Sequence, residues 1–428
     1  MKKLLLIIFI SLILFQCSNE YNPYSPASKE GFFQEQLLPY LGKKDQSLVV
    51  LVYLNCANDL ESYGVYDFYV EMQGGDFLSP DKEITFLVLM DRIIGYSSYD
   101  DWAGTRLYEI NRNGTRRLGN ASINGVTLQS SGDSDELNMG DYKTLQDFIY
   151  YGMNHYPADQ YILDIWNHGD GWKGPGGTDR TGLMKGVSWD EESANDYLHM
   201  DEVQQALQYN VNAFGRKIDC LYFDACVMQM IEVAYELKDV VKYLAASQAS
   251  VPAYGGDYLD MIARFKDLAN LTPLNLAIEI HNSYEYQYQS TADVTSSVVD
   301  TSYVDTLVNA INIFAQNLTN TNILAITNAR KNVKGFYCPL GAEISFHADL
   351  YYFAQEMNAV TGSDNVRNAV LQIVKDNFYT TSPASKGISI YLPFPKDYVE
   401  AEYIGNPYNI DFIAGSQWRD FIQWYDNQ

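Results

Sequence analysis

The sequence contains little cysteine. Its 428 residues include five, which are irregularly spaced: Cys17, Cys56, Cys220, Cys226 and Cys338. This number and spacing exclude a disulfide-stabilised scaffold. Neither the cysteines nor the five histidines are spaced like the ligands of a structural zinc site. We therefore assign no metal site and expect the fold to be held by a hydrophobic core.

Positive charge is also scarce. Lysine and arginine total 29 against 54 aspartates and glutamates, so the formal net charge is −25. A polyanion of this kind is repelled by the phosphate backbone, and nucleic acid is therefore not an expected partner. No apolar run reaches the eighteen or so residues of a membrane-spanning helix. Hydrophobic residues nevertheless make up 47% of the chain, enough for a sizeable core.

The N-terminus has the pattern of an export signal. Two lysines precede an apolar run of twelve residues, Leu4 to Phe15, which is too short to cross a bilayer. Cys17 follows in a context that resembles a bacterial lipobox, although larger residues precede it than is usual. We predict a signal peptide at residues 1–16 and a lipidated tether at residues 17–46, with a plain cleavage site as the alternative. This implies a lipid anchor in the bacterial cell envelope, at the outer membrane or cell surface.

Apolar strands and amphipathic helices alternate along the rest of the chain. Strand-like runs occupy residues 48–54, 84–90, 161–166, 221–223, 243–246 and 387–392. Helical patterns occupy residues 60–72, 141–155, 200–214 and 227–238. This alternation predicts an α/β fold, a mostly parallel sheet sandwiched between helices. We assign residues 47–270 to the core, 271–376 to a helical insertion or subdomain, and 377–428 to a returning strand and C-terminal segment.

Two of the predicted strands end in residues that carry chemistry. Strand 161–166 leads into His168 and Gly169, and strand 221–223 leads into Cys226. Functional residues of a parallel sheet gather beyond the carboxyl ends of its strands. A helix predicted after Cys226 would favour its thiolate. Cys226 is thus a candidate nucleophile, His168 a candidate acid and base, and the N–H groups of Gly169 and Cys226 a candidate oxyanion hole. The alternative is a buried structural cysteine and a loop histidine with a structural role.

Three longer blocks surround these residues: residues 156–172, which contain Asn-His-Gly, residues 219–237, which contain Asp-Ala-Cys, and residues 246–252, which begin Ala-Ser-Gln. These blocks resemble the clostripain family of caspase-like cysteine peptidases. Weaker similarity occurs at residues 53–61 and 387–393. The resemblance implies a caspase-like sheet between helices, with His168 as acid and base and Cys226 as nucleophile.

Members of this family cleave after arginine or lysine and hold that side chain with acidic residues. The resemblance assigns substrate binding to Asp224, Ser247, Gln248 and Tyr254. Tyr254 occupies the position of the aspartate in the family's loop sequence Pro-Gly-Asp-Gly. Without that carboxylate, a basic side chain of the substrate loses about 1.5–3 kcal/mol of interaction energy. The preference is therefore expected to be weakened or altered. Either Asp224, helped by Asp257, still selects a basic residue, or Tyr254 favours an uncharged or aromatic one.

Together with the export signal and Cys17, the resemblance indicates a secreted, membrane-anchored cysteine endopeptidase acting on proteins or peptides. Family members are activated by cleavage between the histidine and cysteine blocks, and clostripain uses calcium. The loop at residues 169–197 contains Lys173, Arg180 and Lys185 as candidate cleavage sites, and acidic residues that include Asp190. Calcium therefore stays open, but we assign no cofactor.

Two other functions compete with the peptidase. One is a catalytically inactive binding module that keeps the caspase-like scaffold. The other is a glycan-binding surface lipoprotein, suggested by 35 tyrosines, the acidity and the tether. The second offers no account of the His-Gly and Ala-Cys blocks. The sequence leaves the oligomeric state open.

Overall fold

The computed structural model describes residues 46–99, 102–172, 186–336, 345–394, 399, 401–405 and 410–428. The predicted signal peptide, the predicted tether up to residue 45 with Cys17, and the candidate cleavage sites lie outside these residues. From Gln46 to Gln428 the chain forms one compact unit. Among the described residues, we find no helix with both the length and the apolar character needed to cross a membrane.

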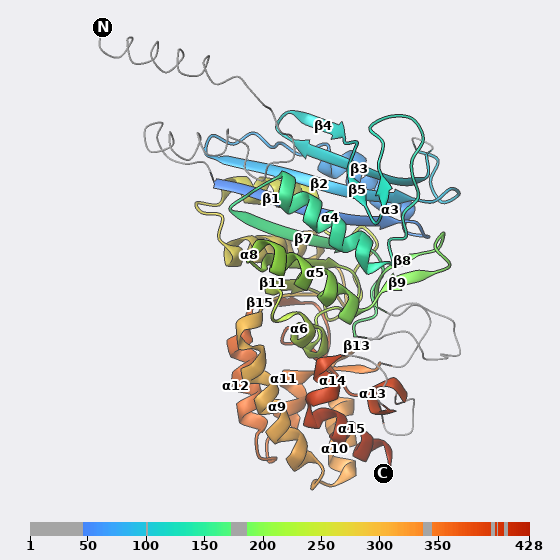
Figure 1. The fold of residues 1–428 in the computed structure, drawn as a ribbon. Helices are drawn as coiled ribbons and strands as arrows, with labels where there is room; N and C mark the ends of the chain where they lie inside the picture. The colour runs from blue at the N-terminus through green and yellow to red at the C-terminus, as the bar shows by residue number, and fades with distance from the viewer. Residues whose placement is uncertain are drawn as a thin grey trace. The chain divides into compact units, whose positions relative to one another are not determined.

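The central element is a sheet of nine strands (Figure 1). In spatial order they are β15 (Val374–Tyr379), β12 (Thr295–Asp300), β11 (Val241–Ala246), β10 (Ile218–Asp224), β7 (Gln160–Trp166), β1 (Gln46–Cys56), β2 (Lys82–Arg92), β3 (Gly104–Asn111) and β4 (Gly114–Arg117). The five strands from β11 to β2 are parallel, and the two at each edge pair antiparallel. Because parallel neighbours need crossover connections, helices separate most of the central strands in sequence.

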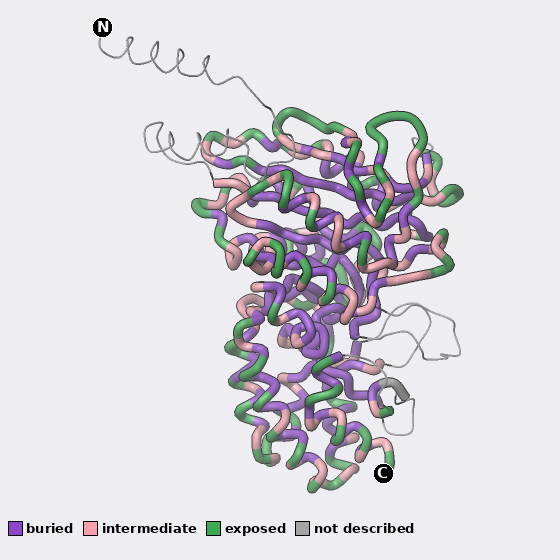
Figure 2. The backbone as a smooth tube through the Cα atoms, viewed as in Figure 1, coloured by how far each residue is buried: buried purple, intermediate pink, exposed green. Residues whose placement is uncertain are grey.

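Both faces of this sheet are buried, as β1 illustrates. Val49, Leu51 and Tyr53 belong to one core, while the residues between them belong to a second. Successive side chains of a strand point to opposite faces of the sheet. A nearly continuous apolar run therefore contributes side chains to both cores. Figure 2 shows the resulting band of buried backbone through the centre of the sheet.

Helices on the two faces close these cores. The first core includes residues of α4 (Tyr142–His155), α5 (Met200–Phe214) and α6 (Ile231–Leu237). The second includes residues of α3 (Glu61–Tyr66), the π-helical segment η1 (Asp67–Met72), α7 (Tyr258–Asp267) and α8 (Pro273–Tyr288). Helix α4 begins as predicted, because the Asp141 side chain accepts from the N–H of Lys143 and caps the helix.

The C-terminal part extends the first core. It comprises η2 (Thr301–Tyr303), α9 (Val304–Leu318), α10 (Ile323–Asn332), α11 (Leu350–Glu356), α12 (Ser363–Ile373), α13 (Ala401–Gly405), α14 (Asp411–Gly415) and α15 (Gln417–Asp426). A small sheet joins β13 (Gly335–Phe336), β14 (His347–Asp349) and β16 (Ser389–Tyr391). Short hairpins are formed by β5 (Ser122–Ile123) with β6 (Val126–Thr127) and by β8 (Val187–Asp190) with β9 (Asp196–Leu198).

The structure differs from the sequence reading in the segment at residues 271–376. Besides helices, this segment supplies β12 and the first half of β15, and the two strands complete one edge of the main sheet. Both strands are short and rich in polar residues, so they lack the apolar run that marks a central strand. The predicted strand at residues 387–392 forms β16 of the small sheet and does not return to the main one.

Candidate active site

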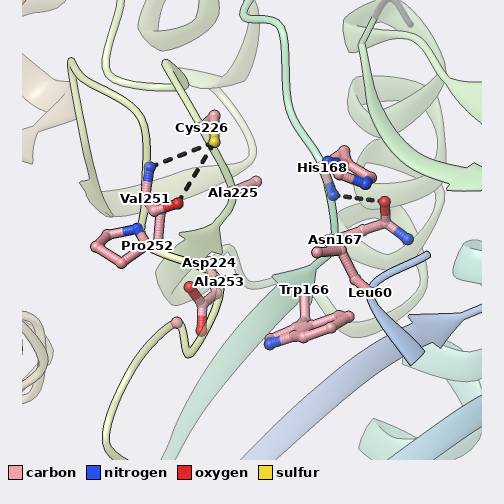
Figure 3. Close-up of a pocket in the computed structure, with 11 residues that line it drawn as sticks. Leu60, Trp166, Asn167, His168, Asp224, Ala225, Cys226, Val251, Pro252 and Ala253 are labelled. Carbon is pink, nitrogen blue, oxygen red and sulfur yellow. Dashed lines mark hydrogen bonds between the residues drawn. The ribbon is translucent and has the colours of Figure 1, made fainter. Parts of the chain in front are cut away.

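A cavity of about 200 Å³ lies at the carboxyl ends of β7 and β10 (Figure 3). It is lined by Leu60, Trp166, Asn167, His168, Asp224, Ala225, Cys226, Val251, Pro252, Ala253 and Gly255. These strands are parallel neighbours, with Trp166 paired to Asp224. The loops that follow them therefore start side by side, which brings both predicted catalytic residues, His168 and Cys226, to the same cavity.

Cys226 lies in a constrained turn. The residue after it, Val227, has a φ of 53°, which a β-branched residue rarely adopts. The N–H of Val227 donates to the carbonyl oxygen of Ala249 at 3.0 Å, which ties the turn to the segment after β11. Sγ of Cys226 accepts from the N–H of Val251 at 3.3 Å. Figure 3 shows the sulfur facing that segment.

The thiol of Cys226 is not at the start of a helix, contrary to the sequence prediction. Helix α6 begins at Ile231, so its dipole does not act directly on the sulfur. Burial raises the pKa of Cys226 to about 11, and the negative charges of Asp224 and Asp170 add to this, while the hydrogen bond from Val251 lowers it. The free protein therefore holds Cys226 as a thiol at neutral pH.

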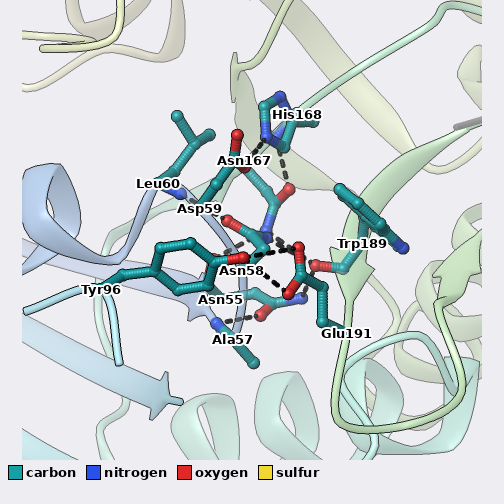
Figure 4. Close-up of polar contacts among 10 residues, drawn as sticks. All are labelled: Asn55, Ala57, Asn58, Asp59, Leu60, Tyr96, Asn167, His168, Trp189 and Glu191. Atoms are coloured by element: carbon teal, nitrogen blue, oxygen red, sulfur yellow. Dashed lines mark hydrogen bonds and ion pairs between the residues drawn. The ribbon is translucent and has the colours of Figure 1, made fainter. Parts of the chain in front are cut away.

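His168 is oriented by a carboxylate that the sequence analysis did not single out. Its Nε2 lies 2.8 Å from Oδ1 of Asp59 (Figure 4). The hydrogen bond to His168 lowers the pKa of Asp59, although partial burial opposes the shift. The imidazole also lies beside the indole of Trp189, with 5.9 Å between ring centroids. Asp59 therefore carries a negative charge against one ring nitrogen of His168.

The carbonyl oxygen of Trp189 joins three asparagines behind this histidine. It accepts from the side-chain amides of Asn58 at 2.7 Å, Asn55 at 3.0 Å and Asn167 at 3.2 Å. Asn167 also donates to the carbonyl oxygen of Asn55 at 2.7 Å. Figure 4 shows these contacts linking the ends of β1 and β7 to β8. The loop that carries His168 is thereby fixed to β1 and β8.

Gly169 packs directly against the turn that holds Cys226. A Cβ at this position would lie 2.6 Å from the carbonyl oxygen of Cys226 and 2.9 Å from Cβ of Ala225. No other residue fits without displacing that turn. The structure thus places the two residues of the predicted oxyanion hole next to one another.

Asp224 is the acidic residue of the cavity wall. Its Oδ2 accepts from the N–H of Gly256 at 2.7 Å. Gly255 has a φ of 55°, and a Cβ there would lie 2.4 Å from the same oxygen. Burial raises the pKa of Asp224 to about 6, and the hydrogen bond from Gly256 moderates the shift. Asp224 is therefore mostly ionised at neutral pH.

Further buried acids surround Asp224. Burial raises the pKa of Asp67 well above its usual range, and the charges of Asp224 and Glu71 raise it further. Burial likewise raises the pKa of Glu71 to about 7. Asp164 accepts from the hydroxyl of Tyr258 at 2.7 Å, and its pKa is also raised, chiefly by burial. All four acids are buried, and Asp224 is the member of this group that lines the cavity.

The other predicted substrate-binding residues do not line the cavity. Ser247 is buried, and its hydroxyl bonds to the carbonyl of Ala249 and to Thr295. Gln248 is buried as well, donating to Asp349. The ring of Tyr254 is 54% exposed and stacks edge-on against two tyrosines, Tyr63 and Tyr66. Asp257, the other acid considered for the pocket, caps α7 by accepting from the N–H of Asp260.

The structure adds two residues that the sequence analysis missed. Asp59 lies in the block of weak family similarity at residues 53–61, shortly after the end of β1. Its position beyond the carboxyl end of a central strand was the feature of the sequence that could have marked it as a candidate site residue. Asp67 gave no signal, because an acid within a helical pattern is ordinarily read as solvent-exposed.

Comparison with known proteins identifies the family. Residues 52–425 match the model of the clostripain family. Clostripain of Hathewaya histolytica is 32% identical over 205 residues, which are 46% of this chain and only 36% of that protein's length. A secreted C11 cysteine protease from Bacteroides thetaiotaomicron, solved with an irreversible peptide inhibitor, superposes with a TM-score of 0.62 at 18% identity, covering 89% of this chain and 99% of its own.

A second solved structure agrees with the first. An inactive zymogen C11 protease from Parabacteroides distasonis superposes with a TM-score of 0.59 at 17% identity, covering 82% of this chain and 93% of its own. These likenesses confirm the predicted caspase-like α/β fold. The family match over most of the chain, on this fold, shows that the protein belongs to the clostripain family of cysteine peptidases.

Proposed function

We propose that the protein is a secreted, membrane-anchored cysteine endopeptidase with a weakened preference for arginine or lysine before the scissile bond. One observation carries the proposal: His168 and Cys226 line a single cavity whose wall also includes the carboxylate of Asp224. A nucleophile, a proton carrier and an acidic specificity residue together suit hydrolysis after a basic side chain.

The proton of the Cys226 thiol must leave when the sulfur attacks. Asp59 engages Nε2 of His168, so Nδ1 is the nitrogen that accepts this proton and passes it to the departing amine. Sγ bonds to the peptide carbonyl carbon, the C–N bond breaks, and water then hydrolyses the thioester. The N–H groups of Gly169 and Cys226 would stabilise the intermediate oxyanion.

The carboxylate of Asp224 supports a preference for a basic side chain before the scissile bond. Because it supplies one negative charge, this preference is expected to be weakened. Among the described residues that line the cavity, Asp224 supplies the single carboxylate. A charge-assisted hydrogen bond contributes about 1.5–3 kcal/mol, so removing the charge of Asp224 should cost arginine substrates roughly tenfold or more in kcat/KM. Citrulline has nearly the shape of arginine without its charge, and it is therefore the matched comparison.

The test uses purified protein lacking residues 1–17 and a peptide library varied at the residue before the scissile bond. We expect cleavage that Cys226→Ala abolishes, with arginine and lysine preferred modestly over citrulline. Asp224→Asn should remove the preference while leaving cleavage of citrulline peptides. Cleavage that survives Cys226→Ala would overturn the nucleophile assignment. A preference for aromatic residues would instead favour Tyr254 as the specificity residue.

The envelope location forms a separate part of the proposal. It rests on the export signal and on Cys17, which follows the apolar run in a lipobox-like context. The precursor expressed in a bacterium should incorporate labelled palmitate, and the Cys17→Ala precursor should not. Equal labelling of both would exclude a lipid anchor at Cys17 and leave the peptidase proposal intact.

A further inference from the structure

The turn that carries Cys226 is strained, and buried hydrogen bonds hold it in place. Val227 keeps a φ of 53°, which a β-branched residue adopts only where its surroundings enforce it. The bond from Val227 to Ala249 and the bond from Val251 to the sulfur tie this turn to residues 247–251. Whatever fixes the turn and this segment therefore also fixes the direction in which the sulfur points.

Gln229 ties the turn to two strands. It is completely buried, and its side-chain amide donates to the carbonyl oxygen and the hydroxyl of Ser297 at 2.9 and 3.0 Å. Its carbonyl oxygen accepts from the N–H and the hydroxyl of Ser389 at 3.0 and 3.1 Å. Its own N–H donates to the carbonyl oxygen of Ser247 at 3.0 Å. Gln229 therefore joins the turn to β12, to β16 and to the segment after β11.

Gln248 holds the segment 247–251 in a similar way. Its side chain is buried, and its Nε2 donates to Oδ2 of Asp349 at 3.1 Å. Its Oε1 accepts at 2.9 Å from the N–H of Gly387, which lies 139 positions further along the chain. The same oxygen of Asp349 accepts from the N–H of Lys386 at 2.6 Å. Because both ends of the Gln248 amide are bound, the side chain has a single orientation.

The contacts of the two glutamines converge on residues 386–389. The N–H of Gly387 binds Gln248, and its carbonyl oxygen accepts at 2.6 Å from the hydroxyl of Ser297, which also binds Gln229. Ser389 binds Gln229 directly. Residues 386–389 lead into β16 of the small sheet and are not among the residues that line the cavity. They therefore act on the turn of the candidate nucleophile from outside the substrate site.

We propose that Gln229 and Gln248 are positioning residues, which hold Sγ of Cys226 in place for attack by tying its turn to residues 386–389. The proposal rests on Cys226 being the nucleophile of the function proposed above. Attack requires alignment of sulfur and carbonyl carbon, and a displacement of about 1 Å can cost roughly a hundredfold in rate. Neither glutamine contacts the substrate in this arrangement. Their effect is therefore expected on kcat, with KM nearly unchanged.

The test replaces each glutamine with methionine, which is similar in length and size but lacks the amide. In protein lacking residues 1–17, Gln229→Met and Gln248→Met should each lower kcat for an arginine peptide at least about tenfold, with KM changed by less than about twofold. Asn210→Leu is the matched control, because Asn210 is also buried and its amide donates two hydrogen bonds within the pair α4 and α5. It should lower Tm similarly and leave kcat unchanged.

A second measurement does not need peptidase activity. Hydrogen exchange of the amides of Val227 and Val251 should become faster in both glutamine variants and stay unchanged in Asn210→Leu. Ser389→Ala removes one of the two hydrogen bonds to the carbonyl oxygen of Gln229 and keeps the other, so it should fold. It should change both measurements in the same direction as the glutamine variants, by a smaller factor.

The outcomes distinguish this proposal from the proposed function. Absence of cleavage by every protein, together with faster exchange in the glutamine variants, would reject the peptidase and still support the hold on the turn. Unchanged exchange at Val227 and Val251 would overturn the proposal, whether or not a peptide is cleaved. A glutamine variant with the kcat of the parent, or a loss of kcat in Asn210→Leu that is just as large, would overturn it too. If neither glutamine variant folds, the same criteria apply to Ser389→Ala.

Discussion

Oδ1 of Asp59 lies 2.8 Å from Nε2 of His168. The two residues are more than one hundred positions apart, but each follows a central strand, β1 and β7, which pair in parallel. The carboxylate fixes the orientation of the imidazole and leaves Nδ1 for proton exchange. In the proposed mechanism, Asp59 is therefore a positioning residue that acts through His168.

Replacing Asp59 tests this role. Asp59→Asn removes the charge that orients His168, and we expect kcat to fall about tenfold to a hundredfold, with KM nearly unchanged. Steady-state kinetics on an arginine peptide would measure both. Asp59→Glu should restore part of kcat, and Glu83→Gln, which changes an exposed acid of β2, should have no effect. A rise in KM with constant kcat would assign Asp59 to substrate binding instead.

The raised pKa of Asp224 predicts a pH dependence of substrate binding. Only the ionised carboxylate attracts a basic side chain, and its pKa is about 6. KM for an arginine peptide should therefore rise as the pH falls below about 6. KM for the matching citrulline peptide should stay constant over the same range. Parallel changes for the two peptides would exclude ionisation of Asp224 as the cause.

Asp67 should lower stability at neutral and alkaline pH. Its folded pKa is raised, so folding holds a proton that the unfolded chain releases above about pH 4, and stability falls as the pH rises. Asp67→Asn removes this penalty. We expect its Tm to exceed that of the parent by several degrees at pH 8 and by much less at pH 4. An equal difference at both pH values would show that ionisation is not responsible.

Gly255 should be intolerant of any side chain. Its φ of 55° and the 2.4 Å approach of a Cβ to Asp224 both oppose alanine. Gly215, with a φ of 67° and open space around it, provides the matched control for backbone strain alone. In urea unfolding, Gly255→Ala should lose about 1–2 kcal/mol more than Gly215→Ala. Equal losses would mean that the loop moves freely away from Asp224.

Much of the fold follows from local pattern. The strands β1, β2, β7 and β10 are apolar runs that only a doubly covered sheet can bury, so their existence could be predicted. The edge strands β12 and β15 could not, because short polar strands depend on a neighbour for pairing. Similarly, the predicted helix after Cys226 begins later, since the turn at Val227 is imposed by contacts with the segment after β11.

By itself, the sequence predicted that the loops carrying His168 and Cys226 follow strands of a parallel sheet, and the structure places both residues along one cavity because those strands are neighbours. Only the tertiary structure decided which other residues join them. It brought Asp59 to the histidine and turned Tyr254 against Tyr63 and Tyr66. Strand ends and apolar periodicity are local properties, whereas contacts between loops depend on how the whole chain packs.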